Sequence, residues 1–236
     1  MTSIKQTVLI TGATSGIGKA ITLQLIAKGF NVCFCGKTPE KMNEILKLIA
    51  DISPDRYFAR TFDLLSEADC IRFVRDSEHK FGQIDILINN AGANTHRAKV
   101  EDMNTDAFLY MLKLNTLVPS IFMREVVKPM IIRKNGLIIN ILSTACLFTN
   151  EFIGEYSASK AALDSLTKIF RKEVRKDHIR VCSVYPGGTN TPFRSTPRPE
   201  YMPPEAVANA VLNVVTSDPN IALDDIVLRP FVEMNF

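Results

Sequence analysis

The chain has 236 residues, of which 46% are hydrophobic and 22% charged, with a formal net charge of +3. These values suit one globular domain over residues 1–236. The basic residues are scattered, so we expect no nucleic-acid partner. We expect no membrane partner either, because no apolar run approaches the roughly 18 residues that a spanning helix needs.

Short apolar runs alternate with longer helical patterns along the chain. Strands are expected at residues 7–11, 31–35, 56–61, 84–92, 136–143, 179–187 and 225–230. Helices are expected after the first strand to about residue 28, then at 39–52, 66–82, 101–130, around Tyr156, and at 203–217. Hydrophobic strands alternating with helices indicate a parallel sheet covered on both faces. We therefore predict an α/β fold, a single-domain, doubly wound Rossmann fold with a seven-stranded, mainly parallel sheet and helices on both faces.

Residues 186–204, "PGGTNTPFRSTPRPEYMPP", are rich in Pro, Thr and Gly. The segment is too long for an ordinary connection between a strand and a helix, and long loops in compact domains are usually functional or disordered. We expect a substrate loop at about residues 188–204 rather than a linker between domains.

The first strand runs into a glycine-rich turn, "TGATSGIG" at residues 11–18. Gly12 allows the tight turn, while Gly16 and Gly18 let a pyrophosphate approach the backbone. The following helix then presents its N-terminus to the phosphates. A bare turn is the alternative, but its position on the first βα connection favours a dinucleotide site.

The second strand ends at Gly36, where a dinucleotide site for NAD usually carries an acidic residue, and Lys37 follows. No carboxylate is present there to repel a 2′-phosphate, and an ammonium is present to attract it. The sequence thus favours NADP(H) as cofactor, with NAD(H) as the alternative if Lys37 is only a solvated loop residue. Asp63 and Leu64 follow the third strand and are expected to contact the adenine.

Four polar residues suggest chemistry at the carboxyl ends of the later strands. Asn115 interrupts an apolar helical stretch, Ser143 ends the fifth strand, and Tyr156 and Lys160 share a helix face in "GEYSASKAAL". Taken singly, each residue suits a structural role: a buried amide, a strand-end cap and a surface pair. Together, behind a dinucleotide turn, they favour catalysis.

The segments "TGATSGIG", "NNAG" (89–92), "YSASK" and "PG" (186–187), with Asn115 and Ser143, resemble the classical short-chain dehydrogenase/reductases in order and spacing. The resemblance covers essentially the whole chain. Within that family the chain looks like the small bacterial NADP-dependent oxidoreductases. The cofactor-binding residues that these motifs and the resemblance imply are Gly12, Thr14, Ser15, Gly16, Ile17, Gly18, Lys37, Asp63, Leu64, Asn90, Ala91, Gly92, Tyr156, Lys160, Pro186, Gly187, Thr189 and Thr191.

The resemblance also implies catalytic roles for Asn115, Ser143, Tyr156 and Lys160. Tyr156 would be the general acid in reduction and the base in oxidation, with Ser143 holding the substrate oxygen. Lys160, with the charge of an oxidised nicotinamide, is expected to lower the pKa of the phenol by about three units, or roughly 4 kcal/mol. Lys160 would also bind the nicotinamide ribose, and Asn115 would link it to a proton relay.

These features predict an NADP(H)-dependent oxidoreductase that interconverts a small-molecule alcohol and a carbonyl by hydride transfer. The alternative is a catalytically inactive sensor or scaffold of the same fold. Such proteins commonly lose the tyrosine or the lysine, and this chain has both. Ser143, Leu147, Phe148, Phe152 and Phe193 are expected to line the substrate pocket.

Other residues leave alternatives open. His96 and Arg97 either meet a substrate carboxylate or are solvated loop residues, and the same two alternatives stay open for Arg194 and Arg198. The helices around 101–130 and 153–176 carry apolar residues beyond one face, and by analogy with the family we expect a homodimer or homotetramer. The five cysteines and three histidines lack metal-ligand spacing, so no metal is expected. Buried thiols and the lack of a signal peptide favour a cytoplasmic protein.

Overall fold

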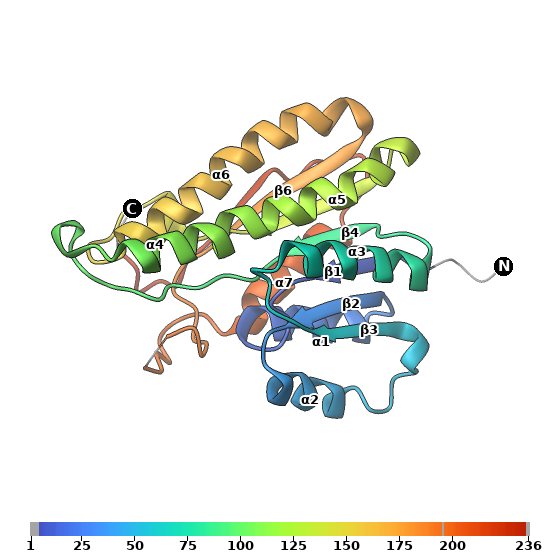
Figure 1. The fold of residues 1–236 in the computed structure, drawn as a ribbon, viewed down its shortest axis with the longest axis horizontal. Coiled ribbons are helices and arrows are strands. Elements are labelled where there is room, and N and C mark those ends of the chain that lie inside the picture. The colour runs from blue at the N-terminus through green and yellow to red at the C-terminus, as the bar shows by residue number, and fades with distance from the viewer. Residues whose placement is uncertain (1–4, 195, 235–236) are drawn as a thin grey trace.

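A seven-stranded sheet forms the centre of the computed structural model, which describes residues 5–194 and 196–234 (Figure 1). Its strands are β1 (Thr7–Ile10), β2 (Asn31–Gly36), β3 (Tyr57–Thr61), β4 (Ile86–Asn89), β5 (Gly136–Ile141), β6 (Ile179–Pro186) and β7 (Asp225–Leu228). Their order is β3-β2-β1-β4-β5-β6-β7, and each neighbouring pair is parallel. The predicted doubly wound α/β fold is confirmed.

Helices cover both faces of this sheet (Figure 1). They are α1 (Gly16–Ala27), α2 (Pro39–Leu48), α3 (Glu67–Phe81), α4 (Thr105–Leu112), α5 (Val118–Arg133), α6 (Gly154–Val174) and α7 (Pro204–Val215). Helices α1, α2 and α7 bury their apolar residues on one face, and α3, α5 and α6 bury theirs on the other. Short 3₁₀ turns lie at η1 (Pro54–Arg56), η2 (Val100–Asp102), η4 (Thr144–Cys146) and η5 (Arg175–Asp177). Within the described part of the chain, no helix is long and apolar enough to cross a membrane.

The long helix predicted at residues 101–130 is broken into parts. After α4 the backbone forms a π-helical turn, η3 (Lys113–Leu117), before α5 begins. The wider π turn surrounds Asn115, whose side chain is fully buried and bonds outside its own helix. Turns of this kind insert one extra residue and often mark functional sites. The helical periodicity that predicted the segment does not reveal this insertion.

A chain of buried polar side chains ties α6 to the sheet. The Asn89 amide donates to Asn140 Oδ1 at 2.9 Å, and the Asn140 amide donates to Thr167 Oγ1 at 2.8 Å. Buried polar groups are stable only when they are paired in this way. The contacts therefore hold α6, which carries Tyr156 and Lys160, in a defined position on β4 and β5.

The carboxyl ends of β1, β4, β5 and β6 meet at one edge of the sheet, as parallel strands require. Ligands of open α/β sheets bind at this edge. The loop predicted at 188–204 begins here and is closed at its base, because the Asn190 N–H donates to the Met202 carbonyl at 2.8 Å and the Met202 N–H donates to the Gly188 carbonyl at 3.1 Å. The loop thus returns to the same edge before α7 starts.

Candidate active site

The glycine turn packs directly against the end of β4. Gly12 has a φ of +64°, and a Cβ atom there would lie 2.7 Å from the Cα of Ala91. The Asn90 side-chain amide donates to the carbonyls of Thr11 and Gly12 at 3.0 Å each. Thr11 Oγ1 in turn accepts from the N–H groups of Asn90 and Ala91 at 3.1 Å. Two segments nearly eighty residues apart therefore form one rigid floor.

This floor leaves room for a phosphate group at the N-terminus of α1. Gly16 begins that helix, and Ser15, its N-cap residue, makes no side-chain capping bond to the first-turn N–H groups. Both residues line a cleft that runs along the edge of the sheet. The positive end of a helix with free N–H groups suits a pyrophosphate, so the residues present fit a dinucleotide.

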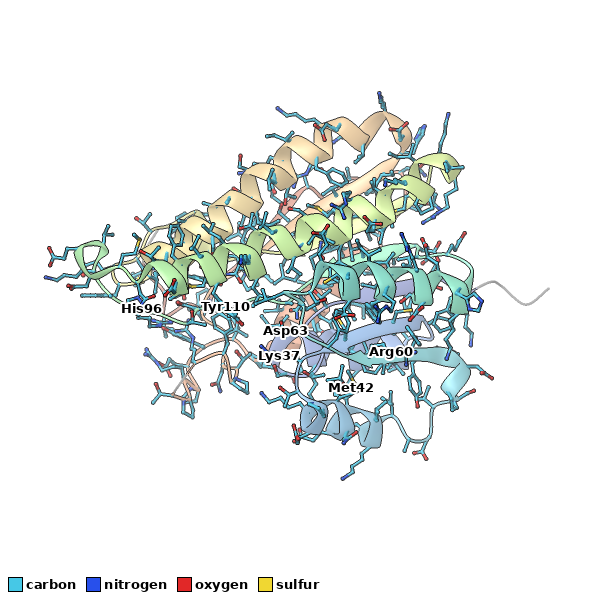
Figure 2. All side chains as sticks on the ribbon, viewed as in Figure 1. Lys37, Met42, Arg60, Asp63, His96 and Tyr110 are labelled. Carbon is cyan, nitrogen blue, oxygen red and sulfur yellow. The ribbon has the colours of Figure 1, made fainter. Side chains whose placement is uncertain are left out.

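The far end of the cleft carries a pair of opposite charges. Lys37 Nζ lies 2.9 Å from Asp63 Oδ2, and both side chains are about half-exposed. Figure 2 shows the two residues side by side at the ends of β2 and β3. Thr38 and Lys41, at the start of α2, line the cleft beside them and were not predicted. They follow Gly36 closely in the sequence and bring a hydroxyl and a second ammonium, so the sequence itself could have indicated them as cofactor-binding residues.

The candidate catalytic residues converge at the other end of the cleft. The side chains of Ser143, Tyr156 and Lys160 all line it, and the Ser143 hydroxyl is close enough to the Tyr156 phenol to lower its pKa. Tyr156 and Lys160 are almost wholly buried in the first two turns of α6. The geometry is that of a phenol and a hydroxyl placed to share one substrate oxygen.

Burial dominates the protonation of this pair. It raises the pKa of Tyr156 to about 12 and lowers the pKa of Lys160 to about 8. The groups that oppose this rise at Tyr156 are Ser143, by a hydrogen bond, and the positive charges of Arg194 and Arg97. Lys160 is not among the charges that lower this pKa when no cofactor is bound, and its ammonium donates to the Ile141 carbonyl at 2.8 Å.

Asn115 lies behind the cleft rather than on its wall. Its Oδ1 accepts from the Ala93 N–H at 2.8 Å, and its Nδ2 donates to the Ala93 carbonyl and to Ser159 Oγ, both at 2.9 Å. A Cβ on Gly92 would lie 3.1 Å from Asn115 Oδ1 and 3.3 Å from Lys160 Nζ. Asn115 thus joins the segment after β4 to α6 beside the lysine.

The structure brings the sequence-predicted cofactor residues together in this one cleft. Those that line it are Gly12, Thr14, Ser15, Gly16, Ile17, Gly18, Lys37, Asp63, Leu64, Asn90, Ala91, Gly92, Tyr156, Lys160, Pro186, Gly187, Thr189 and Thr191. Of the predicted substrate residues, Ser143 and Phe193 line it too, and the rings of Phe193 and Tyr156 have centroids 5.9 Å apart.

Leu147, Phe148 and Phe152 do not line the cleft, contrary to the sequence-based expectation. After β5 the chain tightens into η4, and the N–H groups of Leu147 and Phe148 both donate to the Thr144 carbonyl. Beyond this turn Phe148 lies beneath the Arg229 guanidinium, 4.7 Å from its ring centroid, and Phe152 is half-exposed. Asn150 and Ile153 from the same segment face the cleft instead.

The C-terminal segment adds a residue that the sequence did not indicate. Glu233 lines the cleft, and its Oε1 accepts from the Gly188 N–H at 2.6 Å. Its Oε2 lies 3.7 Å from Arg229 Nε and against the Cα of Gly187. A lone glutamate near the end of a chain carries no pattern, so only the folded structure shows that it supports residues 187–188. Asn94 and Tyr110 also line the cleft without having been predicted.

The fold and the cleft define a class of protein, the dinucleotide-binding oxidoreductases with a parallel α/β sheet. A family model described as short chain dehydrogenase matches residues 6–201, so the chain belongs to the short-chain dehydrogenase family. Over 225 residues it is 29% identical to an uncharacterized oxidoreductase of Staphylococcus saprophyticus, covering 94% of this chain and 96% of that protein.

Solved structures show the same relationship. The chain is similar to serine dehydrogenase from Escherichia coli, with a TM-score of 0.85 and 26% identity over 97% of this chain and 99% of that one. It is similar to a closed form of serine dehydrogenase complexed with NADP+, with a TM-score of 0.87 and 25% identity over 97% and 96%. The protein is therefore an oxidoreductase of the dehydrogenase/reductase type that binds a nicotinamide dinucleotide. Among the described residues no group of His, Cys, Asp and Glu could hold a metal ion.

Proposed function

We propose that this protein is an NADP(H)-dependent oxidoreductase that interconverts a small alcohol and its carbonyl compound, with Tyr156 as general acid and base. The observation that carries the proposal is the convergence of Ser143, Tyr156 and Lys160 at one end of the cleft whose other end is the glycine turn. No observation in the fold favours an inactive sensor or scaffold, since the phenol, the hydroxyl and the ammonium are all in place.

In the direction of reduction, the bound nicotinamide supplies a hydride to the carbonyl carbon. Ser143 binds the carbonyl oxygen through its hydroxyl and orients it toward Tyr156. With a pKa of about 12, Tyr156 is protonated near neutral pH and gives its proton to the oxygen as negative charge develops. In oxidation the same phenol must lose its proton first, which a charged Lys160 favours by Coulomb attraction.

Asn115 and the floor of the cleft hold this arrangement. Asn115 binds the backbone of Ala93 and the hydroxyl of Ser159, and so fixes α6 against the segment where the nicotinamide half of the cofactor would lie. On the opposite wall, Pro186, Gly187, Thr189 and Thr191 would contact that same half.

The preference for NADP over NAD is supported by the charges at the far end of the cleft. Lys37 and Lys41 line it beside Thr38. The position that usually carries an acidic residue in an NAD site is Gly36 here, so no carboxylate at that position repels a 2′-phosphate. The Lys37 ammonium is held by Asp63, so Lys41 and Thr38 are the groups free to add to the phosphate site. Lys37 would turn from Asp63 toward the phosphate when NADP binds.

Two broader features belong to the same proposal. Apolar side chains on α4, α6 and the π turn are exposed, among them Leu109, Leu117, Leu166 and Ile169. They suit burial between subunits, and we propose a homodimer or homotetramer. The unpaired cysteines, four of them buried, suit a reducing compartment, so we further propose one cytoplasmic domain.

A substrate panel tests the function. NADPH and NADH oxidation would be followed with aldehydes, ketones and oxo acids, in wild type and in Tyr156→Phe. We expect turnover of at least one carbonyl class with NADPH, lost in the variant. Equal rates in the two proteins, or cofactor binding without turnover of any carbonyl, would contradict the proposal.

A further inference from the structure

Two arginines approach Tyr156 from separate segments. Arg194 follows Phe193, whose ring lies 5.9 Å from that of Tyr156, centroid to centroid. Arg97 follows His96, whose Nδ1 lies 2.9 Å from Oε1 of Glu155, the residue before Tyr156. Both arginines line the candidate active-site cleft. Each arginine therefore directly follows a residue that contacts Tyr156 or Glu155.

The segment that carries Arg97 is fixed rather than free. Glu155 is almost fully buried, and besides His96 it accepts from the Asn104 N–H at 3.4 Å. These two contacts tie the connection between β4 and α4, at His96 and at its end, to the start of α6. In Figure 2, His96 lies beside α4. An anchored backbone lowers the entropy lost when a long side chain binds a ligand.

Arg194 is oriented without losing its charge. Its guanidinium lies 4.6 Å from the ring centroid of Tyr201, a cation–π contact that restrains the side chain. No ion pair joins Arg194 or Arg97 to an acidic group anywhere in residues 5–194 or 196–234, whereas Lys37 in the same cleft is paired with Asp63. Two cationic side chains without acidic partners thus face the reaction end of the cleft.

The two acidic residues of the described chain that line the cleft are Asp63, which pairs with Lys37, and Glu233. Glu233 accepts from the Gly188 N–H at 2.6 Å and lies 3.7 Å from Arg229 Nε, so its charge is already committed. The positive charges of Arg194 and Arg97 also lower the pKa of Tyr156, which places both within electrostatic reach of the phenol. A negative group beside the reacting carbon would meet both of them.

We infer that the substrate is a small hydroxy acid, or the corresponding oxo acid, whose carboxylate is bound by Arg97 and Arg194. The inference rests on the proposed function. Guanidinium groups bind carboxylates through paired N–H donors, and this fixes orientation as well as affinity. In oxidation, the carbinol C–H passes as a hydride to the oxidised nicotinamide dinucleotide and the O–H proton passes to the Tyr156 phenolate. The oxo acid, the reduced dinucleotide and a proton are the products.

A binding titration tests this site apart from turnover. Two- and three-position hydroxy acids of three to five carbons, each paired with its primary amide, would be titrated into the enzyme bound to NADPH. An alcohol cannot react with the reduced cofactor, so NADPH fluorescence reports binding alone. We expect at least one acid to bind about tenfold or more tightly than its amide, as charge-assisted hydrogen bonds predict.

The variants Arg97→Gln and Arg194→Gln should each weaken binding of the acid about tenfold and leave binding of the amide unchanged. Lys99→Gln is the matched control, since its side chain is exposed and pairs with Glu101 outside the cleft. Arg97→Lys and Arg194→Lys should keep part of the preference, because they keep the charge. Thermal unfolding would confirm that all variants fold.

The outcomes separate this inference from the proposed function. Tyr156-dependent turnover of neutral carbonyls, with no preference for acids over amides, would overturn the carboxylate site and leave the function standing. Arginine-dependent binding of acids without any turnover would support the site and overturn the function. Arginine variants that weaken acids and amides equally would also overturn the carboxylate site.

Discussion

The ammonium of Lys160 lies 2.8 Å from the carbonyl oxygen of Ile141, the last residue of β5. This contact holds the lysine one helical turn from Tyr156 while the pKa values of both groups are shifted against their charged forms by burial. The Tyr156 phenol therefore stays protonated near neutral pH and can donate its proton when a substrate oxygen binds beside it.

The first prediction concerns the phenol. Tyr156→Phe removes the proton donor while keeping the ring that packs on Phe193, so kcat/KM for carbonyl reduction should fall about 10²–10⁴-fold. The Kd for NADPH, measured by fluorescence, should stay within about twofold. Tyr57→Phe, in β3 and away from the cleft, is the control and should keep full activity.

The second prediction concerns the destabilisation of the fold by the buried charge of Lys160. Its pKa falls from 10.5 to about 8 on folding, which corresponds to about 3 kcal/mol of destabilisation below pH 8. Between pH 8 and 10.5 the unfolded chain binds more protons, so wild-type stability rises with pH across that window. Lys160→Met should raise the Tm by several degrees at pH 7, abolish most activity, and lose this advantage near pH 10.5.

Urea unfolding of both proteins at pH 7 and pH 10 measures the effect. Lys172→Met is the matched control, because Lys172 is exposed on the same helix. A Lys160→Met protein that is less stable than wild type at pH 7 would show that the lysine stabilises the fold.

The third prediction is a pH profile. Because the pKa of Lys160 is about 8, its positive charge is present below that pH and lost above it. Without that charge the Tyr156 phenol is a weaker proton donor, so kcat/KM for reduction should fall as pH rises through about 8. Stopped-flow rates from pH 6 to 10 give the profile, and a flat profile in this range would contradict the assigned role of the ammonium.

The fourth prediction concerns the 2′-phosphate. Lys37→Gln and Lys41→Gln should each raise the Kd for NADPH about tenfold and change the Kd for NADH little, because each removes a charge that only NADP uses. The loss should shrink as salt is added. Lys47→Gln, exposed at the far end of α2, is the control. A tighter Kd for NADH than for NADPH in wild type would show that the preference is reversed.

The fifth prediction concerns the C-terminal segment. Glu233→Ala leaves the Gly188 N–H without its acceptor and loosens the backbone at residues 187–188. We expect the Kd for the cofactor to rise about five- to tenfold. Glu205→Ala, an exposed glutamate in the first turn of α7, should behave as wild type. Unchanged cofactor binding in Glu233→Ala would limit the contact to local packing.

Much of the fold could be predicted because its pattern is local. Apolar β-branched runs of four to eight residues mark strands, and the glycine turn at 11–18 fixes which edge of the sheet binds the dinucleotide. The π turn around Asn115 could not be predicted, because the flanking segments are apolar enough to read as one continuous helix in a single sequence. Strand and helix ends differ from expectation by a few residues, because residues beside an element often fit its pattern too.

The site was predictable where it follows strand ends and not where it depends on loop direction. Ser143, Tyr156 and Lys160 are placed by β5 and α6, so sequence order located them. Leu147 and Phe152 looked equally suitable by composition, but Leu147 follows the tight turn η4, Phe152 is half-exposed, and neither lines the cleft. Glu233 reaches the cleft only through tertiary folding of the C-terminal segment, whereas Thr38 and Lys41 follow Gly36 closely enough for the sequence to indicate them.

The central claim, hydride transfer coupled to a proton from Tyr156, is tested most directly by single turnover with NADPH carrying deuterium at C4. The wild-type protein should transfer the label to the carbonyl carbon of its substrate, as read by mass spectrometry of the alcohol. Tyr156→Phe, with cofactor bound to the same extent, should transfer about 10²-fold less in the same time. Equal label transfer by the two proteins would contradict the account.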